Sequence, residues 1–126
     1  METYSIKGTS QTPTINLDLK NGTLEITGRS IPEDAKTFYK PLNDAVDFYL
    51  LSPKNTSTIN LQFEYINTTS SIAILGILRK FEKIINSEKN VIINWNYEDE
   101  DMLESGEDYQ KVLNLPIKLI QLKTNV

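Results

Sequence analysis

Residues 65–78 read YINTTSSIAILGIL, and the rest of the chain is best understood from this stretch outward. Residues 59–66, which lead into it, alternate between apolar and polar side chains, as in a strand with one buried face. The residues that follow carry apolar side chains at helical spacing, namely Ile74, Ile77, Leu78, Phe81, Ile84 and Ile85. The stretch therefore predicts a junction between a strand in the interior of a sheet and an amphipathic helix.

Four consecutive hydroxyl residues, 68–71, occupy this predicted junction and follow Asn67. One hydroxyl at a helix start can cap the helix and stabilise it by about 1 kcal/mol. A phosphate there would meet free backbone N–H groups and the positive end of the helix dipole. It would add a charge of about −1.5 to −2 and would change docking rather than folding. Capping by one of the hydroxyls and phosphorylation are both open from the residues alone.

Two apolar residues of the predicted helix, Ile72 and Leu75, fall outside its main apolar face. At about 100° per residue they lie on the flank below Thr68. They belong either to a secondary part of the core or to a surface that faces a partner.

Toward the N-terminus, the chain predicts strands and then a helix. Residues 4–7 form a short strand, and residues 14–28 form an antiparallel hairpin that turns at Asn21 and Gly22. Ser30 and Glu33 have the spacing of a capping box, so we expect a helix to start at Ser30. Pro41 lies within this helix and is expected to kink it or split it in two.

Toward the C-terminus, residues 91–97 begin as a continuous apolar run, which is typical of a strand covered on both faces. Residues 98–113 predict a weak helix, in which Gly106 either costs about 1 kcal/mol relative to alanine or marks a bend. Residues 117–122 alternate as a last strand. Helical connections between strands imply parallel pairs. We therefore expect one α/β domain over residues 1–126: a single mixed sheet of about six strands with three to four helices.

The composition excludes many kinds of catalysis. The 126 residues include no Cys and no His, which removes disulfides, thiol catalysis, Ser-His-Asp triads and Cys- or His-ligated metals. We therefore expect a non-catalytic protein with no catalytic residues, no metal and no cofactor. The chain has no run of eighteen apolar residues and no secretory signal, so we expect a cytoplasmic protein without a membrane contact.

The acidic residues are concentrated in one segment. Residues 98–108 hold seven acidic and no basic residues, whereas the rest of the chain holds 13 basic and 10 acidic residues. No basic stripe with interleaved aromatic residues appears, which argues against nucleic-acid binding. The acidic segment suits the first turn of a helix. The alternative, a carboxylate-dependent enzyme, requires a pocket in which these acids converge.

Several stretches together resemble the SiaC family of small bacterial regulatory phosphoproteins, in the same order along essentially the whole chain. The most specific is YINTTS at residues 65–70, and the second is PED at residues 32–34. The others are Gly8-Thr9, Thr12-Pro13, Gly28-Arg29-Ser30-Ile31, Trp95-Asn96-Tyr97 with the acidic run, and Pro116.

The resemblance implies a fold similar to the STAS-like anti-sigma-factor antagonists and a role in partner switching. A Ser/Thr kinase would phosphorylate Thr68, and a PP2C-type phosphatase would remove the phosphate. The unphosphorylated form would bind and activate a diguanylate cyclase and so promote cyclic di-GMP signalling and biofilm formation. We expect the partner to contact Asn67, Thr69, Ser70, Ile72 and Leu75. The alternative is an anti-sigma-factor antagonist that controls transcription.

Overall fold

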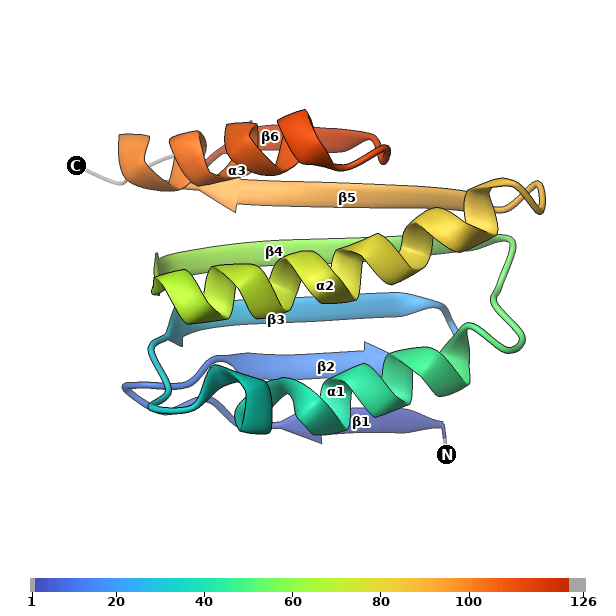
Figure 1. The fold of residues 1–126 in the computed structure, drawn as a ribbon, viewed down its shortest axis with the longest axis horizontal. Coiled ribbons are helices and arrows are strands. Elements are labelled where there is room, and N and C mark those ends of the chain that lie inside the picture. The colour runs from blue at the N-terminus through green and yellow to red at the C-terminus, as the bar shows by residue number, and fades with distance from the viewer. Residues whose placement is uncertain (1, 123–126) are drawn as a thin grey trace.

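Six strands form one mixed sheet in which each strand lies beside the next one in the chain (Figure 1). The computed structural model describes residues 2–122. The strands are β1 (Thr3–Ile6), β2 (Thr14–Asp18), β3 (Thr23–Ser30), β4 (Thr56–Ile66), β5 (Asn90–Tyr97) and β6 (Ile117–Gln121). The helices are α1 (Ala35–Tyr49), α2 (Thr68–Ile85) and α3 (Glu100–Val112). β1 to β3 pair antiparallel and β3 to β6 pair parallel, which confirms the predicted mixed sheet.

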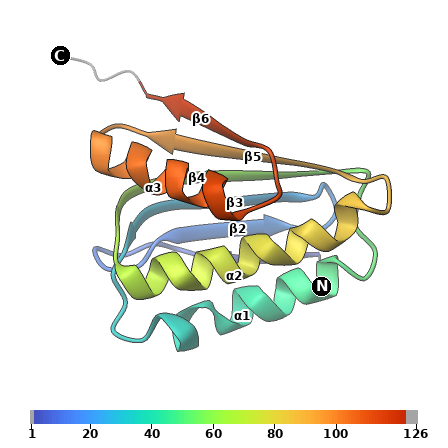
Figure 2. The ribbon, with the colours of Figure 1, turned by 45° about the horizontal axis from the view of Figure 1, so that its top comes forward.

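All three helices pack on the same face of the sheet (Figure 2). Each helix connects two neighbouring parallel strands, and β3 to β6 follow one another in a single direction across the sheet. Because such crossovers are right-handed, the three helices must fall on one side. The core lies between this side of the sheet and the helices, and its largest side chains include Trp95, Tyr39, Phe81, Ile15, Leu17, Leu42, Leu61 and Ile74.

The opposite face of the sheet carries no helix. Along its middle run polar side chains, and Asn94 Nδ2 donates to Asn60 Oδ1 across β5 and β4 at 2.8 Å. Ile92 points to this face and is 37% exposed. The prediction that residues 91–93 are covered on both faces is therefore wrong, because a one-sided helix layer leaves every second residue of β5 uncovered.

The predicted hairpin is confirmed by the pairing of β2 with β3. Gly22 has φ +71°, a left-handed conformation that a residue without Cβ adopts readily, and its N–H donates to the Asp18 carbonyl at 2.9 Å. The turn places β3 beside β2, and β3 pairs in parallel with β4 on its other side, so the carboxyl ends of β3 and β4 lie together at Ser30 and Ile66.

The first helix does not start at Ser30, as the capping-box spacing suggested. Ser30 is the last residue of β3 and is fully buried. The N-cap is Asp34, whose side chain accepts from the backbone N–H of Thr37 at 3.2 Å. Ser30 remains part of β3 because the Ser30 carbonyl accepts from the Asn67 N–H. The helix α1 therefore begins only at Ala35.

Proline and glycine interrupt neither of the helices that contain them. α1 runs unbroken from Ala35 to Tyr49 with Pro41 inside it, and Pro41 is exposed. The carbonyl that loses its donor to Pro41 belongs to the exposed Thr37, where water can replace the missing N–H. α3 likewise continues through Gly106, which is buried against the sheet and marks no bend.

Candidate functional site

The junction between β4 and α2 lies at the carboxyl end of the two central parallel strands. The N–H of Asn67, the single residue between β4 and α2, donates to the Ser30 carbonyl at the end of β3 at 3.0 Å. This is the end of the sheet at which α/β proteins commonly place binding sites. The start of α1 lies close by, because α1 follows β3 after only four residues.

Asn67, rather than one of the hydroxyl residues, caps α2. Its extended backbone (φ −82°, ψ 170°) and its Oδ1, which accepts from the Ser70 N–H at 2.9 Å, are those of an N-cap. The Thr69 hydroxyl also donates to this oxygen, at 3.3 Å. The hydroxyls of residues 68–71 are therefore not needed for the cap, and each occupies a different environment.

Ser70 belongs to a buried chain of hydroxyl groups. The Ser30 hydroxyl donates to Ser70 Oγ at 2.8 Å and shares a hydrogen bond of 2.6 Å with the Tyr39 hydroxyl. Because Ser30 has one hydroxyl hydrogen, Tyr39 is the donor in the second bond. All three residues are fully buried, so the prediction that Ser70 meets a partner does not fit its position.

Ser71 is hydrogen-bonded to a residue of α3. The Tyr109 hydroxyl donates to the Ser71 carbonyl at 2.8 Å and lies 3.0 Å from Ser71 Oγ. Burial raises the pKa of Tyr109 to about 12, and burial likewise raises the pKa of Tyr39 to about 12. Both tyrosines are therefore neutral hydrogen-bond donors at physiological pH, and together they tie the first turn of α2 to α1 and α3. The sequence gives no sign of this role, because helical spacing predicts only that both residues are buried.

Thr68 differs from the other three hydroxyl residues. It is the first residue of α2 and is exposed, and its hydroxyl forms no hydrogen bond within residues 2–122. The backbone N–H groups of a first helical turn and the positive end of the helix dipole lie beside it. Among the four hydroxyls, that of Thr68 is thus both accessible and uncommitted, and a phosphate there would be electrostatically favoured.

A groove opens next to the junction, between the first halves of α1 and α2. It has a volume of about 440 Å³ and is lined by Glu33, Asp34, Ala35, Lys36, Tyr39, Asn43, Thr69, Ile72, Ala73 and Gly76. Ile72 is 65% exposed at its edge, whereas Leu75 is half-buried against the core. The two residues off the main apolar face therefore have different roles: Leu75 contributes to the core, and Ile72 is a surface residue.

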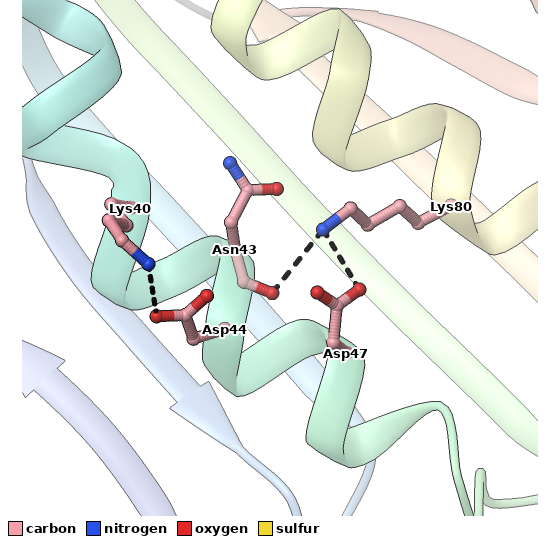
Figure 3. Close-up of polar contacts among 5 residues, drawn as sticks. All are labelled: Lys40, Asn43, Asp44, Asp47 and Lys80. Carbon is pink, nitrogen blue, oxygen red and sulfur yellow. Dashed lines mark hydrogen bonds and ion pairs between the residues drawn. The ribbon is translucent and has the colours of Figure 1, made fainter.

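The groove does not extend along the full length of the two helices. Lys80 of α2 crosses to α1, where its Nζ lies 2.8 Å from Asp47 Oδ1 and 3.5 Å from the Asn43 carbonyl oxygen (Figure 3). Asn43 lines the groove, and Asp47 lies one helical turn further along α1. The Lys80 bridge thus joins the helices beyond the groove, which lies toward the Thr68 end.

Gly76 lines the groove and has no packing reason to be glycine within the described chain. A Cβ added to it would meet no atom within 4 Å, and the residue is exposed. Glycine inside a helix costs about 1 kcal/mol relative to alanine. The sequence shows a glycine inside a predicted apolar helix, but only the structure shows that no other residue covers it.

The acidic segment forms the exposed side of α3. Asp99 caps the helix by accepting from the Met102 N–H at 2.9 Å, and Glu100 and Asp101 lie in the first turn, which confirms the predicted acidic helix start. All seven acidic side chains of residues 98–108 are exposed, and none lines the groove. They therefore do not converge in a pocket, as the carboxylate-dependent enzyme requires.

Residues 2–122 contain neither a metal-binding cluster nor a membrane-spanning helix. No group of three or more acidic, His or Cys residues there is placed to hold a metal ion. No helix in that range has the length and apolar character needed to cross a membrane.

Known proteins are similar to this chain in sequence and in fold. A family model described as "SiaC family regulatory phosphoprotein" matches residues 6–122. An uncharacterized protein of Pseudomonas aeruginosa (strain UCBPP-PA14) is 27% identical over 121 residues, which cover 94% of this chain and 96% of that protein.

Solved structures of SiaC from Pseudomonas aeruginosa have the same architecture. Apo-SiaC is 27% identical, with a TM-score of 0.88 over 95% of this chain and 99% of that one. SiaC in complex with the diguanylate cyclase SiaD, which it activates, is 26% identical, with a TM-score of 0.87 over 94% and 99% of the two chains. The predicted α/β class is confirmed by these matches.

Proposed function

Because the chain belongs to the SiaC family of regulatory phosphoproteins, we propose that its unphosphorylated form binds and activates a diguanylate cyclase and that a phosphate on Thr68 ends this binding. The Pseudomonas aeruginosa relative is an activator of the cyclase SiaD, which supports the choice of partner. The protein itself is a non-catalytic switch formed by one regulatory domain. A Ser/Thr kinase and a PP2C-type phosphatase set its state, and its output is cyclic di-GMP signalling in biofilm formation.

The observation that carries the choice of Thr68 is its exposed and uncommitted hydroxyl in the first turn of α2, next in the chain to the groove residue Thr69. Ser70 and Ser71 are held by buried tyrosine networks, and Thr69 donates to the cap residue. A kinase can reach Thr68 without unfolding the helix, because the cap that starts α2 is supplied by Asn67. Folding and signalling are thus carried by different residues of the same junction.

The groove and its edge are the proposed docking surface. Thr69 and Ile72 line it and are exposed, and they provide the direct contacts. Asn67 and Leu75 support this surface indirectly: Asn67 caps α2, and the half-buried Leu75 packs against the core. A phosphate on Thr68 would place a doubly charged group beside an apolar contact, where its desolvation opposes binding.

Phosphate transfer to Thr68 is tested by intact-mass measurement after incubation with ATP and the Ser/Thr kinase from the same organism. Wild type is expected to gain one phosphate, and Thr68→Ala none. Thr69→Ala and Ser71→Ala, which change neighbouring hydroxyls, serve as matched controls and are expected to gain one phosphate. Uptake of a phosphate by Thr68→Ala at the wild-type rate would show that the site is elsewhere.

The effect on docking is tested by calorimetric titration against a purified diguanylate cyclase from the same organism. Thr68→Asp is expected to bind at least about tenfold more weakly than wild type, a difference of about 1.4 kcal/mol. Thr68→Val keeps the shape of threonine without a charge and is expected to bind as wild type does. Equal affinities for Thr68→Asp and wild type would exclude the switch. Binding to a purified anti-sigma factor instead of the cyclase would favour the alternative role in transcription.

A further inference from the structure

The turn between β2 and β3 contains a chemically reactive pair of residues. Asn21 is exposed and is followed directly by Gly22. Asparagine followed by glycine is prone to deamidation, because glycine has no side chain to shield its backbone nitrogen from the neighbouring carboxamide. The pair that predicts the hairpin is therefore also a candidate modification site, and its chemistry does not depend on the proposed function.

Deamidation of such a pair proceeds through a cyclic imide. The Gly22 nitrogen gives up its proton and forms a bond to Asn21 Cγ. The bond between Cγ and Nδ2 breaks, and the side-chain nitrogen takes up a proton and leaves as ammonia. Solvent water then adds to one of the two imide carbonyls and opens the ring. The product is aspartate or, where the main chain now runs through the former side chain, isoaspartate.

Asp18 engages both reacting groups in the folded chain. Asn21 Nδ2 donates to Asp18 Oδ2 at 2.7 Å, and the Asn21 N–H donates to Asp18 Oδ1 at 3.0 Å. The attacking nitrogen is engaged as well, since the Gly22 N–H donates to the Asp18 backbone carbonyl at 2.9 Å. The hydrogen bonds from Asn21 lower the pKa of the Asp18 carboxyl, so this carboxyl is ionised and accepts both of them at neutral pH.

The turn also has contacts that a changed main chain would disturb. The Gly22 carbonyl accepts from the Thr58 N–H at 2.9 Å, which joins the turn to β4. Gly22 is so closely packed that a Cβ there would lie 2.6 Å from the Tyr49 hydroxyl oxygen. Isoaspartate would add a methylene group to the main chain directly before Gly22 and would displace it from these contacts. Aspartate would replace a donor to Asp18 by a second carboxylate.

We propose that Asn21 is a site of spontaneous deamidation and that the Asp18 side chain controls its rate by holding the Asn21 carboxamide in the folded turn. Asp18 is a positioning residue here, and its effect is to slow the reaction. The pair is long-lived while the turn is closed and reacts when the turn opens. Because the lost ammonia does not return, each event permanently changes the connection between β2 and β3.

The proposal is tested by peptide mapping with mass spectrometry during incubation of the whole protein at mildly alkaline pH. Asp18→Ala loses both side-chain hydrogen bonds and is expected to deamidate Asn21 at least about tenfold faster than wild type. Asp18→Asn keeps only one acceptor oxygen in this place, so its rate is expected to be intermediate. Chromatography separates the aspartate and isoaspartate peptides, both of which are expected.

Asn86 serves as a reference within the same molecule, because it is exposed at the end of α2 and is followed by Ser87. Its deamidation rate is expected to be equal in wild type and in both variants. If Asn21 and Asn86 accelerate together, loss of the fold sets the rate, and the role of Asp18 is wrong. The role is equally wrong if Asn21 reacts in Asp18→Ala and Asp18→Asn at the wild-type rate.

Discussion

At the scale of single residues, the two helical glycines lie in opposite surroundings. Gly76 faces open space, whereas Gly106 lets α3 approach β5 and β6 closely. A Cβ on Gly106 would lie 2.6 Å from Trp95 Cδ1 and 2.7 Å from Leu119 Cδ2. Trp95 cannot move aside easily, because its Nε1 donates to the Met102 carbonyl at 2.7 Å. Removing the glycine should therefore strain the contact between α3 and the sheet.

Gly106→Ala is expected to lower the free energy of unfolding by about 1–2 kcal/mol, since overpacking of a core outweighs the gain in helix propensity. Urea unfolding followed by fluorescence measures this directly, because Trp95 is the only tryptophan of the chain. Gly76→Ala, which should stabilise, is the natural comparison. A stability of Gly106→Ala equal to or above that of wild type would contradict the close packing described for α3.

The residue scale is also where the sequence alone is least informative. Residues 68–71 are four similar hydroxyl residues in a row, and nothing in their order tells which is buried. Their environments differ because helical rotation points Ser70 toward Ser30 and Tyr39 and points Ser71 toward Tyr109. Only the resemblance selected Thr68 among the four hydroxyl residues, whereas its exposure and its lack of a hydrogen-bond partner required the structure.

At the scale of elements, the junction is stabilised by a hydroxyl chain that links β3, α1 and α2. Ser30 is its centre, since it accepts from Tyr39 and donates to Ser70. Removing either end of the chain leaves Ser30 with one partner. Removing the centre leaves two buried polar groups without the partner they share, which costs about 1–3 kcal/mol for each unsatisfied group.

Ser30→Ala is therefore expected to lower the free energy of unfolding by about 2–4 kcal/mol, and Tyr39→Phe or Ser70→Ala by only about 1 kcal/mol each. The ranking is measured by urea unfolding of the three variants. Ser52→Ala, at an exposed position after α1, is the control and should stay within about 0.5 kcal/mol of wild type. Equal effects of the three substitutions would show that Ser30 is not the centre of the chain.

The same hydroxyl explains why one element boundary was predicted wrongly. Ser30 and Glu33 have capping spacing, but Asp34 and Thr37 have it as well. Local spacing cannot rank the two, because Ser30 is held in β3 by residues far away in the chain: its carbonyl accepts from the Asn67 N–H, and its hydroxyl donates to Ser70. The β2–β3 turn at Gly22, whose signal is purely local, was predicted at its observed position, although β3 continues to Ser30, two residues beyond the predicted end of the hairpin.

At the scale of the whole molecule, the topology follows from rules that apply to any chain. The alternation of strands and helices after β3 predicts parallel neighbours, and their observed order confirms it. What those rules leave open is which side chains tie the layers together. Tyr39 and Tyr109 do so here. Tyr109 of α3 bonds directly to Ser71 in the first turn of α2, and Tyr39 of α1 bonds to Ser30 of β3, which in turn donates to Ser70. These ties make the stability of the molecule depend on pH.

Stability is expected to fall between pH 10 and about 12, because burial raises the pKa of both Tyr39 and Tyr109 from 10.0 to about 12. The fold favours the neutral hydroxyls, so their contribution to the free energy of unfolding is complete below pH 10. Above pH 10 this contribution is lost, because the tyrosines ionise more readily in the unfolded chain. For each tyrosine, this rise in the pKa corresponds to a loss on the order of 3 kcal/mol once the pH exceeds its pKa in the fold. Urea midpoints recorded from pH 8 to pH 11.5 measure the loss, and Tyr39→Phe/Tyr109→Phe should flatten the profile. A double variant with the wild-type slope would show that other groups govern alkaline unfolding.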